Sequence, residues 1–174
     1  VRKVIDYVDY MRSLREKRIK DSIKARVYEA EIIANAIYTK NRQTKSNAEI
    51  AAMIKSALRT IRFNNGRGYY FATNLNGIEE LFADHPEMEG RNLIDLRDSK
   101  GKYVIREMIN IANTHGEGFY EYSWTKPGRE GNYHQKIAYV KKFSPLNWLI
   151  GTGEYVEDVE GDIQREILDR IAKI

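Results

Sequence analysis

Lys136 is the residue whose type and position point most directly to chemistry. It stands inside a segment that alternates like a β-strand, between Tyr133-His134 and Ile137-Ala138. An enclosed lysine can hold an anionic group, because hydrogen bonds that involve a charge are about twice as strong as neutral ones. A lysine on an edge strand can equally face water and prevent sheets from associating. These residues alone leave both interpretations open.

Aromatic residues spaced two apart form a second candidate group. Tyr120, Tyr122 and Trp124 alternate, so they share one face of a predicted strand. Their hydroxyl and indole N–H groups can orient a ligand while the rings exclude water. Packing in the core is an equally reasonable role for any one of them.

The segment that follows Gly66 predicts an aromatic strand and then an Asn-Gly hairpin turn, in which two residues take positive φ. Tyr69 and Phe71 point to one face and Tyr70 to the other, and parity does not say which face would line a pocket. Tyr139 and Lys136 also have opposite parity. Both reach one ligand only if their strand bulges or one contact is indirect, so Tyr139 is the weaker candidate.

The loop after the hairpin should lie over the open face of the sheet. His85 and Arg91 bracket it, and Arg91 can clamp a carboxylate with two hydrogen bonds. An arginine in a loop is often solvated or paired with an acid instead. Acids near it in the sequence are Glu87, Glu89 and Asp95. Met88 and Leu93 are predicted to be apolar residues of this lid.

Patterns for catalysis or metal binding are absent from the sequence. It contains no cysteine, and His85, His115 and His134 have no metal-ligand spacing. Glu79 and Glu80 are adjacent on a strand, so they point to opposite faces and do not form an acid–base pair. No nucleophile elbow or phosphate loop occurs. We therefore expect no catalytic residues, no cofactor and no metal.

Length and composition indicate one soluble globular domain. The chain has 174 residues, of which 42% are hydrophobic and 31% charged. Its net charge of +4 is too diffuse to indicate nucleic acid binding. No apolar run approaches the roughly 18 residues of a membrane span, and no signal peptide is visible. The first residue is not methionine, so we expect an excised fragment with any membrane anchor outside it.

The first 42 residues contain neither Gly nor Pro, and their apolar residues recur at three- and four-residue steps. This pattern predicts a helix of about 63 Å that extends beyond the globule, as a stalk would. Two helices broken near Arg15 to Lys20 are the alternative. The further predicted elements are a helix at 48–62, a hairpin with its second strand at 79–84, a helix at 103–114, strands at 118–125, 134–142 and 148–153, and a helix at 156–174.

This order predicts an α+β fold of PAS-like type, with an antiparallel sheet of about five strands, a long N-terminal helix and a C-terminal helix. One face of the sheet would pack on the long helix, and the other would line a cavity. We divide the single predicted domain into N-terminal helices (1–63), a sheet with its pocket (66–155) and a closing helix (156–174).

Seven short segments carry a resemblance to a known family. They are Gly68–Phe71 with the Asn76-Gly77 turn, His85-Pro86, Gly90–Leu93, Arg97–Gly101, Gly118–Trp124, Lys136–Val140 and Trp148–Gly153. In this order they resemble the single-Cache (sCache) family of extracytoplasmic sensor domains, found on bacterial chemoreceptors and sensor histidine kinases. The resemblance covers about residues 66 to 158, and the flanking helices agree in type and position.

The resemblance implies a non-catalytic sensor domain at the periplasmic face of the bacterial inner membrane. Transmembrane helices outside this chain would flank it. It would bind a small metabolite, most often a short-chain carboxylate such as acetate, propionate, lactate or pyruvate. Its terminal helices would pass the signal to a cytoplasmic output module such as a histidine kinase or a chemotaxis module. The family position favours a pocket role for Lys136 and also for Tyr70.

Two other functions compete with this one. A protein-interaction or structural module on a helical stalk would have no ligand-sized cavity. A small hydrolase would need a nucleophile and a base that the sequence does not show. The stalk helix could pair with a second copy in a homodimer, although Arg12, Arg15 and Arg18 make the expected seam poorly apolar.

Overall fold

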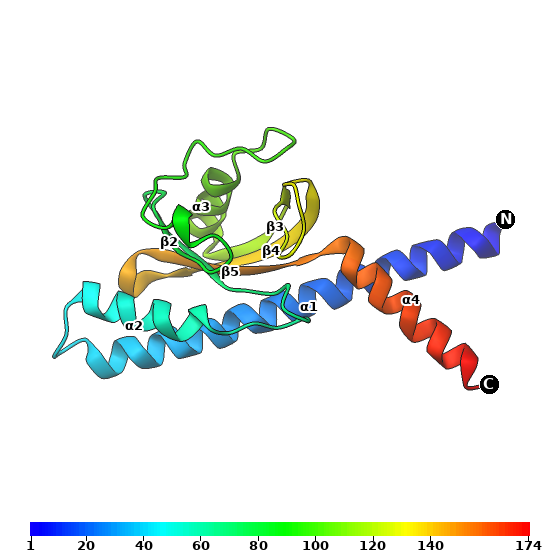
Figure 1. The fold of residues 1–174 in the computed structure, drawn as a ribbon, viewed down its shortest axis with the longest axis horizontal. Coiled ribbons are helices and arrows are strands. Elements are labelled where there is room, and N and C mark those ends of the chain that lie inside the picture. The colour runs from blue at the N-terminus through cyan, green and yellow to red at the C-terminus, as the bar shows by residue number, and fades with distance from the viewer.

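The computed structural model describes residues 1–174 and confirms the predicted α+β, PAS-like architecture (Figure 1). A five-stranded antiparallel sheet has the strand order β2-β1-β5-β4-β3. Its elements are α1 (Arg2–Asn41), α2 (Asn47–Arg59), β1 (Phe71–Asn74), β2 (Glu79–Phe82), α3 (Val104–His115), β3 (Glu117–Trp124), β4 (His134–Phe143), β5 (Trp148–Tyr155) and α4 (Val156–Ala172). None of the helices combines the length and the apolar character that crossing a membrane requires.

Helix α1 is continuous over 40 residues, without the alternative break near Arg15 to Lys20. Its middle and C-terminal parts lie along one face of the sheet, and its N-terminal part extends beyond the sheet (Figure 1). The buried residues Ile19, Ile23 and Val27 recur at the helical step and face the sheet. The stalk-like extension predicted from the periodicity is therefore present.

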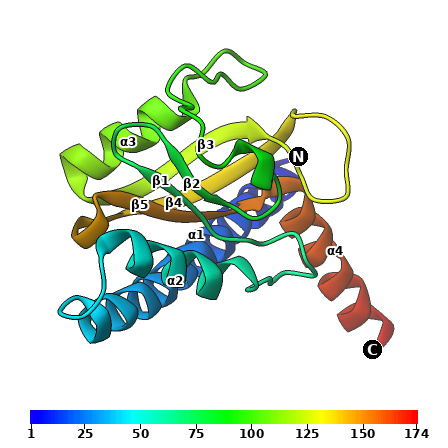
Figure 2. The ribbon, with the colours of Figure 1, turned by 60° about the vertical axis from the view of Figure 1, so that its left-hand side comes forward.

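Helix α2 lies beside α1 on the same face of the sheet (Figure 2). A capping box starts it: the Ser46 hydroxyl accepts a bond of 3.1 Å from the Glu49 N–H, and the Glu49 carboxylate accepts one of 3.2 Å from the Ser46 N–H. The helix ends at Arg59, three residues before the predicted Arg62. Its buried residues Ile50, Ile54 and Leu58 pack against α1 and the sheet.

The turn between β1 and β2 differs from the prediction. Of Asn76 and Gly77, only Gly77 has positive φ, at 101°. The Asn74 side chain accepts hydrogen bonds from the N–H groups of Asn76 (2.9 Å) and Ile78 (3.1 Å). These bonds stabilise a turn that is longer than the predicted two-residue hairpin. Because the Asn74 side chain satisfies the N–H groups of this turn, only one of its residues needs a left-handed conformation.

The two faces of the sheet bury different sets of residues. Ala72 and Ile150 pack towards α1 and α2, while Phe71 and Leu149 belong to the cluster that includes α3. Figures 1 and 2 show α3 on one side of the sheet, with α1 and α2 on the other. The loop between β2 and α3 lies on the α3 side, so the predicted open face is the face that carries α3.

Candidate functional site

Lys136 is almost completely buried, with 1% of its surface exposed. It lies on the α3 face of β4, beside Gly153 of β5. A Cβ at position 153 would lie 2.5 Å from Lys136 Cε, so only glycine leaves room for the lysine stem. The ammonium group donates a hydrogen bond of 3.2 Å to the Tyr69 hydroxyl and forms no salt bridge. Lys136 is therefore a buried amine that forms no ion pair.

Aromatic rings surround this ammonium group. Lys136 Nζ lies 4.5 Å from the ring centre of Tyr69, 5.2 Å from that of Tyr155 and 5.7 Å from that of Phe71. Burial lowers the pKa of Lys136 to about 7, although Asp84 and Glu154 act in the opposite direction. A carboxylate placed next to Nζ would favour the charged form and raise that pKa.

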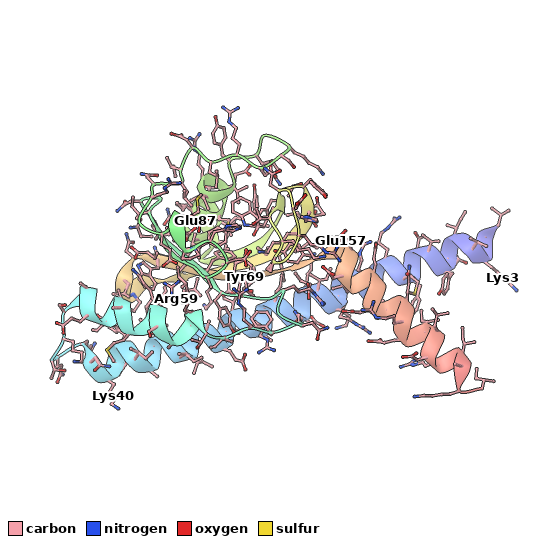
Figure 3. The ribbon with its side chains drawn as sticks, viewed as in Figure 1. Lys3, Lys40, Arg59, Tyr69, Glu87 and Glu157 are labelled. Carbon is pink, nitrogen blue, oxygen red and sulfur yellow. The ribbon has the colours of Figure 1, made fainter.

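A small cavity adjoins Lys136, and we call it the inner cavity. Its volume is about 10 Å³, which is room for about one water molecule. It is lined by Tyr69, Phe71, Glu79, Phe82, Val104, Met108, Tyr122 and Trp124. Lys136 stands behind this lining, because its Nζ lies within 5.9 Å of the rings of Tyr69, Phe71 and Tyr122. Figure 3 labels Tyr69, which lies inside the fold, whereas Lys3 and Lys40 mark the exposed ends of α1.

A larger cavity of about 240 Å³, here the outer cavity, lies under the loop that follows β2. Its lining includes His85, Met88 and Asp98. Phe82 and Trp124 line both cavities, and their rings stack at 6.1 Å with an angle of 18°. This stacked pair forms the wall between the two cavities.

Most of the residues predicted for the site lie around these cavities. Tyr122 and Trp124 line the inner cavity, while His85, Met88 and Trp124 line the outer one. Tyr120 stacks on Tyr122 at 5.5 Å and donates a hydrogen bond to the Glu107 carboxylate.

Leu93 lines neither cavity. It is buried in the hydrophobic cluster that also contains Tyr122.

Three predicted residues are not brought to the site. Tyr70 and Tyr139 lie on the opposite face of the sheet, where Tyr70 donates a hydrogen bond of 2.8 Å to the Arg26 carbonyl and Tyr139 donates one to Glu117. Tyr69 and Tyr70 precede β1 and belong to hydrophobic clusters on opposite faces of the sheet. Strand β4 pairs without a register shift between Lys136 and Tyr139, so these two residues also face opposite sides. Arg91 is exposed, with its guanidinium 3.6 Å from the Met88 sulfur.

Four residues of the site were not singled out from the sequence: Tyr69, Phe71, Tyr155 and Glu79. Their spacing in the sequence did place Tyr69 and Phe71 on a common face of the sheet, but it did not show that this face lines the pocket. Tyr155 pairs with Lys136 across β4 and β5, which depends on the strand order. Glu79 is 3% exposed and accepts a hydrogen bond of 2.9 Å from the Thr73 hydroxyl. Burial raises the pKa of Glu79 to about 8.

Two ion pairs connect the loop between β2 and α3, here the lid, to neighbouring helices. Arg59 at the end of α2 binds Glu89 with two hydrogen bonds of 2.7 and 2.6 Å. Further along the lid, Asp95 accepts a hydrogen bond of 2.8 Å from the exposed Arg106 of α3. These contacts connect the lid to helices on both faces of the sheet.

The whole chain matches the model of one protein family. The family model described as a Cache domain matches residues 1–174. The chain belongs to the Cache domain family. This confirms the resemblance read from the seven sequence segments.

Solved structures of similar fold are chemosensory domains. A methyl-accepting chemotaxis protein from Vibrio parahaemolyticus superposes with a TM-score of 0.77 and 30% identity, covering 88% of this chain and 99% of that one. A Cache chemosensory domain described for carboxylic acid recognition has a TM-score of 0.68 and 23% identity, covering 85% of this chain and 97% of that one. Because the second structure is only 23% identical, its similarity to this chain shows a shared fold and no more.

Curated relatives are chemotaxis proteins and a sensor histidine kinase, and all of them are much longer than this Cache domain. The methyl-accepting chemotaxis protein McpP of Pseudomonas putida is 30% identical over 64% of this chain and 20% of its own length. The sensor histidine kinase MctS of Rhizobium johnstonii is 31% identical over 72% of this chain and 27% of its own length. The chain thus spans about a quarter or less of these relatives.

A third hollow in this Cache domain lies away from Lys136. It is a groove of about 550 Å³ between the N-terminal part of α1 and α4, lined by residues such as Val8, Met11, Ile163 and Ile167. No fully buried charge faces it. The groove belongs to the contact between the terminal helices, whereas the buried Glu79 lies in the lining of the inner cavity.

Proposed function

We propose that this Cache domain is the extracytoplasmic ligand-binding sensor of a membrane signal-transduction receptor, and that it binds a short-chain carboxylate at Lys136. Acetate, propionate, lactate and pyruvate represent the ligand class. The receptor is a histidine kinase or a methyl-accepting chemotaxis protein. The domain itself carries no catalytic step.

The observation that carries this proposal is the unpaired state of Lys136. Leaving an ionised group buried without a partner costs several kcal/mol, so buried lysines are normally paired or partly neutral. Lys136 has one neutral hydrogen-bond partner, Tyr69, and its ammonium can donate further hydrogen bonds. A ligand carboxylate beside Nζ supplies both the missing charge and the missing acceptors.

The site needs to widen before a ligand enters. The inner cavity, of about 10 Å³, holds about one water molecule, which is less than a carboxylate needs. The outer cavity of about 240 Å³ lies next to it, behind the Phe82–Trp124 pair. Rotation of Trp124 away from Phe82 joins the two volumes and gives a ligand access to Lys136. The fold shared with the carboxylic-acid-binding domain is compatible with such a ligand.

Transmission runs through the terminal helices in this proposal. Helix α4 follows β5 directly and packs on α1 through Val159 and Ile163, which lie in one cluster with Ile19 and Ile23. Both chain ends lie at the same end of the molecule (Figure 1). A ligand that favours one arrangement of α4 against α1 shifts the population of receptor states. The similarity to a methyl-accepting chemotaxis protein and to a sensor histidine kinase supports a periplasmic location for the domain.

Isothermal titration calorimetry at pH 7 with the four acids tests the binding claim. We expect Lys136→Met to abolish binding of all of them. The matched control is Lys142→Met, because Lys142 lies further along the same strand and is only half-buried. Equal affinity of wild type and Lys136→Met for any of the acids would overturn the assignment.

A homodimer through α1 is the second partner that we propose. Val4, Ile5 and Val8 are 66%, 54% and 46% exposed on the extension of α1. A second copy of this helix covers such an apolar surface. Sedimentation should detect a dimer of the wild type and a monomer of Ile5→Glu/Val8→Glu. A monomeric wild type at concentrations up to the millimolar range would exclude it.

A further inference from the structure

The second buried ionisable group of the inner cavity is Glu79. It is 3% exposed and lines the cavity together with Tyr69, Tyr122 and Trp124. Thr73 is the one side chain that donates a hydrogen bond to its carboxyl group, and Glu79 forms no salt bridge. Two buried ionisable groups without an ion pair therefore lie at this cavity: the carboxyl of Glu79 in its lining, and the amine of Lys136 behind Tyr69.

An irregularity in the sheet aims Glu79 into the cavity. The register of β1 and β2 pairs Phe71 with Phe82 and Ala72 with Leu81, and then shifts so that Thr73 pairs with Glu79. Without this shift, alternation from Phe82 would place Glu80 on the cavity face. Bulges of this kind redirect a side chain and are frequent next to functional sites.

Glu80 shows the consequence of the shift. It points to the opposite face, where its carboxylate pairs with Lys55 of α2 at 2.6 Å. The bulge thus separates two adjacent glutamates: Glu80 is paired with a cation, and Glu79 is buried without an ion pair. A packing role alone does not need a carboxyl group at position 79, because the rest of the lining is mainly aromatic and apolar.

Thr73 bonds to one oxygen of Glu79, and no side chain donates to the other. Burial, together with repulsion from Glu89 and Glu80, raises the pKa of Glu79 to about 8, although hydrogen bonds from Thr73 and from the Glu80 N–H act against this. Glu79 is therefore mainly a neutral carboxylic acid at pH 7. Because Thr73 donates to one oxygen, the O–H of the other oxygen is a hydrogen-bond donor, as in other enclosed acids that are kept protonated.

We propose that Glu79 is a specificity-determining contact of the ligand site and selects carboxylates that carry a keto or hydroxyl oxygen on the carbon next to the carboxylate. This inference rests on the proposed function and deepens it. Lys136 holds the carboxylate, and the Glu79 O–H donates to the second oxygen. An unsubstituted acid leaves that buried donor unpaired, and sites built around such a hydrogen bond reject ligands that lack the matching group.

The test compares matched ligands, so that effects common to all acids cancel. Propanoate, 2-oxopropanoate, 2-hydroxypropanoate and 2-aminopropanoate are titrated into wild type, Glu79→Met, Glu79→Gln and the control Glu80→Gln at pH 7. In the wild type we expect the two oxygen-bearing acids to bind about tenfold more tightly than propanoate. Glu79→Met should lower the ratio between the affinities for the oxygen-bearing acids and for propanoate to about one, while the affinity for propanoate itself is retained. Glu79→Gln should keep it, because the amide still donates, and Glu80→Gln should leave it unchanged.

A measurement on the wild type alone covers the case in which Glu79→Met does not fold. Raising the pH from 6 to 9 removes the proton of Glu79. The affinity for the oxygen-bearing acids relative to that for propanoate should therefore fall towards one. Changes in Lys136, Tyr69 and Tyr122 affect all the acids through the same carboxylate and cancel in the ratio. The Glu79→Gln variant should show no such fall.

The outcomes separate this inference from the proposed function. If the affinity ratio between the oxygen-bearing acids and propanoate is unchanged in Glu79→Met, or in wild type at pH 9, the role of Glu79 is overturned. The proposed carboxylate site still stands in that case, provided that Lys136→Met loses all binding. Tightest binding of 2-aminopropanoate also overturns it, because an ammonium group requires an ionised Glu79. No binding of any acid to the wild type overturns the proposed function and the role of Glu79 with it.

Discussion

Lys136 and Tyr155 face each other across β4 and β5, and Tyr155 is the residue at which β5 ends and α4 begins. Lys136 Nζ lies 5.2 Å from the centre of the Tyr155 ring. An anion that draws the ammonium group towards the inner cavity weakens this contact. The proposed ligand site is therefore one side chain away from the start of the helix that leaves the domain.

The hydroxyl of Tyr155 fixes this junction, because it donates a hydrogen bond of 2.7 Å to the Thr125 carbonyl. Tyr155→Phe keeps the ring beside Lys136 and removes that bond. We expect the free energy of unfolding to fall by about 1 to 2 kcal/mol and the ligand affinity to stay within about threefold of wild type. Urea unfolding and calorimetry measure the two effects. Tyr133→Phe, at a position that is 67% exposed, is the control, and loss of all binding in Tyr155→Phe would contradict the assignment.

Burial of Lys136 makes stability depend on pH. Its pKa is about 7 in the fold and 10.5 in the unfolded chain, so between these values the unfolded chain binds more protons. The free energy of unfolding therefore gains a contribution that rises with pH across this window. We expect ligand-free Lys136→Met to be more stable than wild type at pH 6, by on the order of 4 kcal/mol, with the difference shrinking towards pH 10. Urea unfolding at several pH values tests this, and a constant difference would refute it.

Carboxylate binding should take up a proton in the same range. Above pH 7 part of the free protein has a neutral Lys136, and a bound carboxylate favours the charged form. The dissociation constant should therefore rise by up to about tenfold per pH unit above pH 7 and be nearly constant below it. Calorimetry in buffers of different ionisation enthalpy measures the proton directly. Binding without proton uptake at pH 8 would argue against Lys136 as the cation.

Sequence patterns predicted the elements well, because each periodicity reports local burial. The step of three and four residues that predicted α1 corresponds to buried residues such as Ile19, Ile23 and Val27. Lys136 was singled out because a lysine within a strand has no obvious solvent role, and the structure shows that it is buried. These signals depend on neighbours in the chain and need no knowledge of how the elements pack.

Which face of the sheet lines the site depends on packing that the strands do not encode. Parity separated Tyr69 from Tyr70, but the packing of α1 and α2 on one face decided that Tyr70 would point away from Lys136. Identifying Glu79 as the residue that faces the cavity required one further fact, the register shift after Ala72. A bulge in so short a hairpin leaves no periodic signal, so the sequence could not distinguish Glu79 from Glu80.

Glu79 should affect stability in the direction opposite to Lys136. Its pKa is about 8 in the fold and 4.5 in the unfolded chain, so the folded state binds more protons between these values. The stabilising contribution present below pH 4.5 is lost as the pH rises to 8. Glu79→Gln should therefore match wild type near pH 4.5 and be the more stable protein at pH 9. Glu80→Gln lacks this pattern because Glu80 pairs with Lys55, and a similar pH profile for both variants would contradict the burial of Glu79.

The attachment of α4 to the sheet gives a final prediction. Arg67 donates a hydrogen bond of 2.9 Å to the buried Glu154 at the end of β5 and another of 2.9 Å to Asp162 of α4. Removing one partner of a buried ion pair leaves a charge without compensation, so Arg67→Met should lower the free energy of unfolding by about 3 to 5 kcal/mol.

Arg165→Met is the matched control for that network. Arg165 also pairs with Asp162, but its side chain is 69% exposed, and exposed pairs contribute less than about 1 kcal/mol. Urea unfolding of both variants, with Asp162→Asn beside them, measures the difference. If Arg67→Met is no more destabilised than Arg165→Met, Asn64 and the Tyr155 N–H compensate Glu154, and the connection from β5 to α4 through Arg67 does not hold the helix.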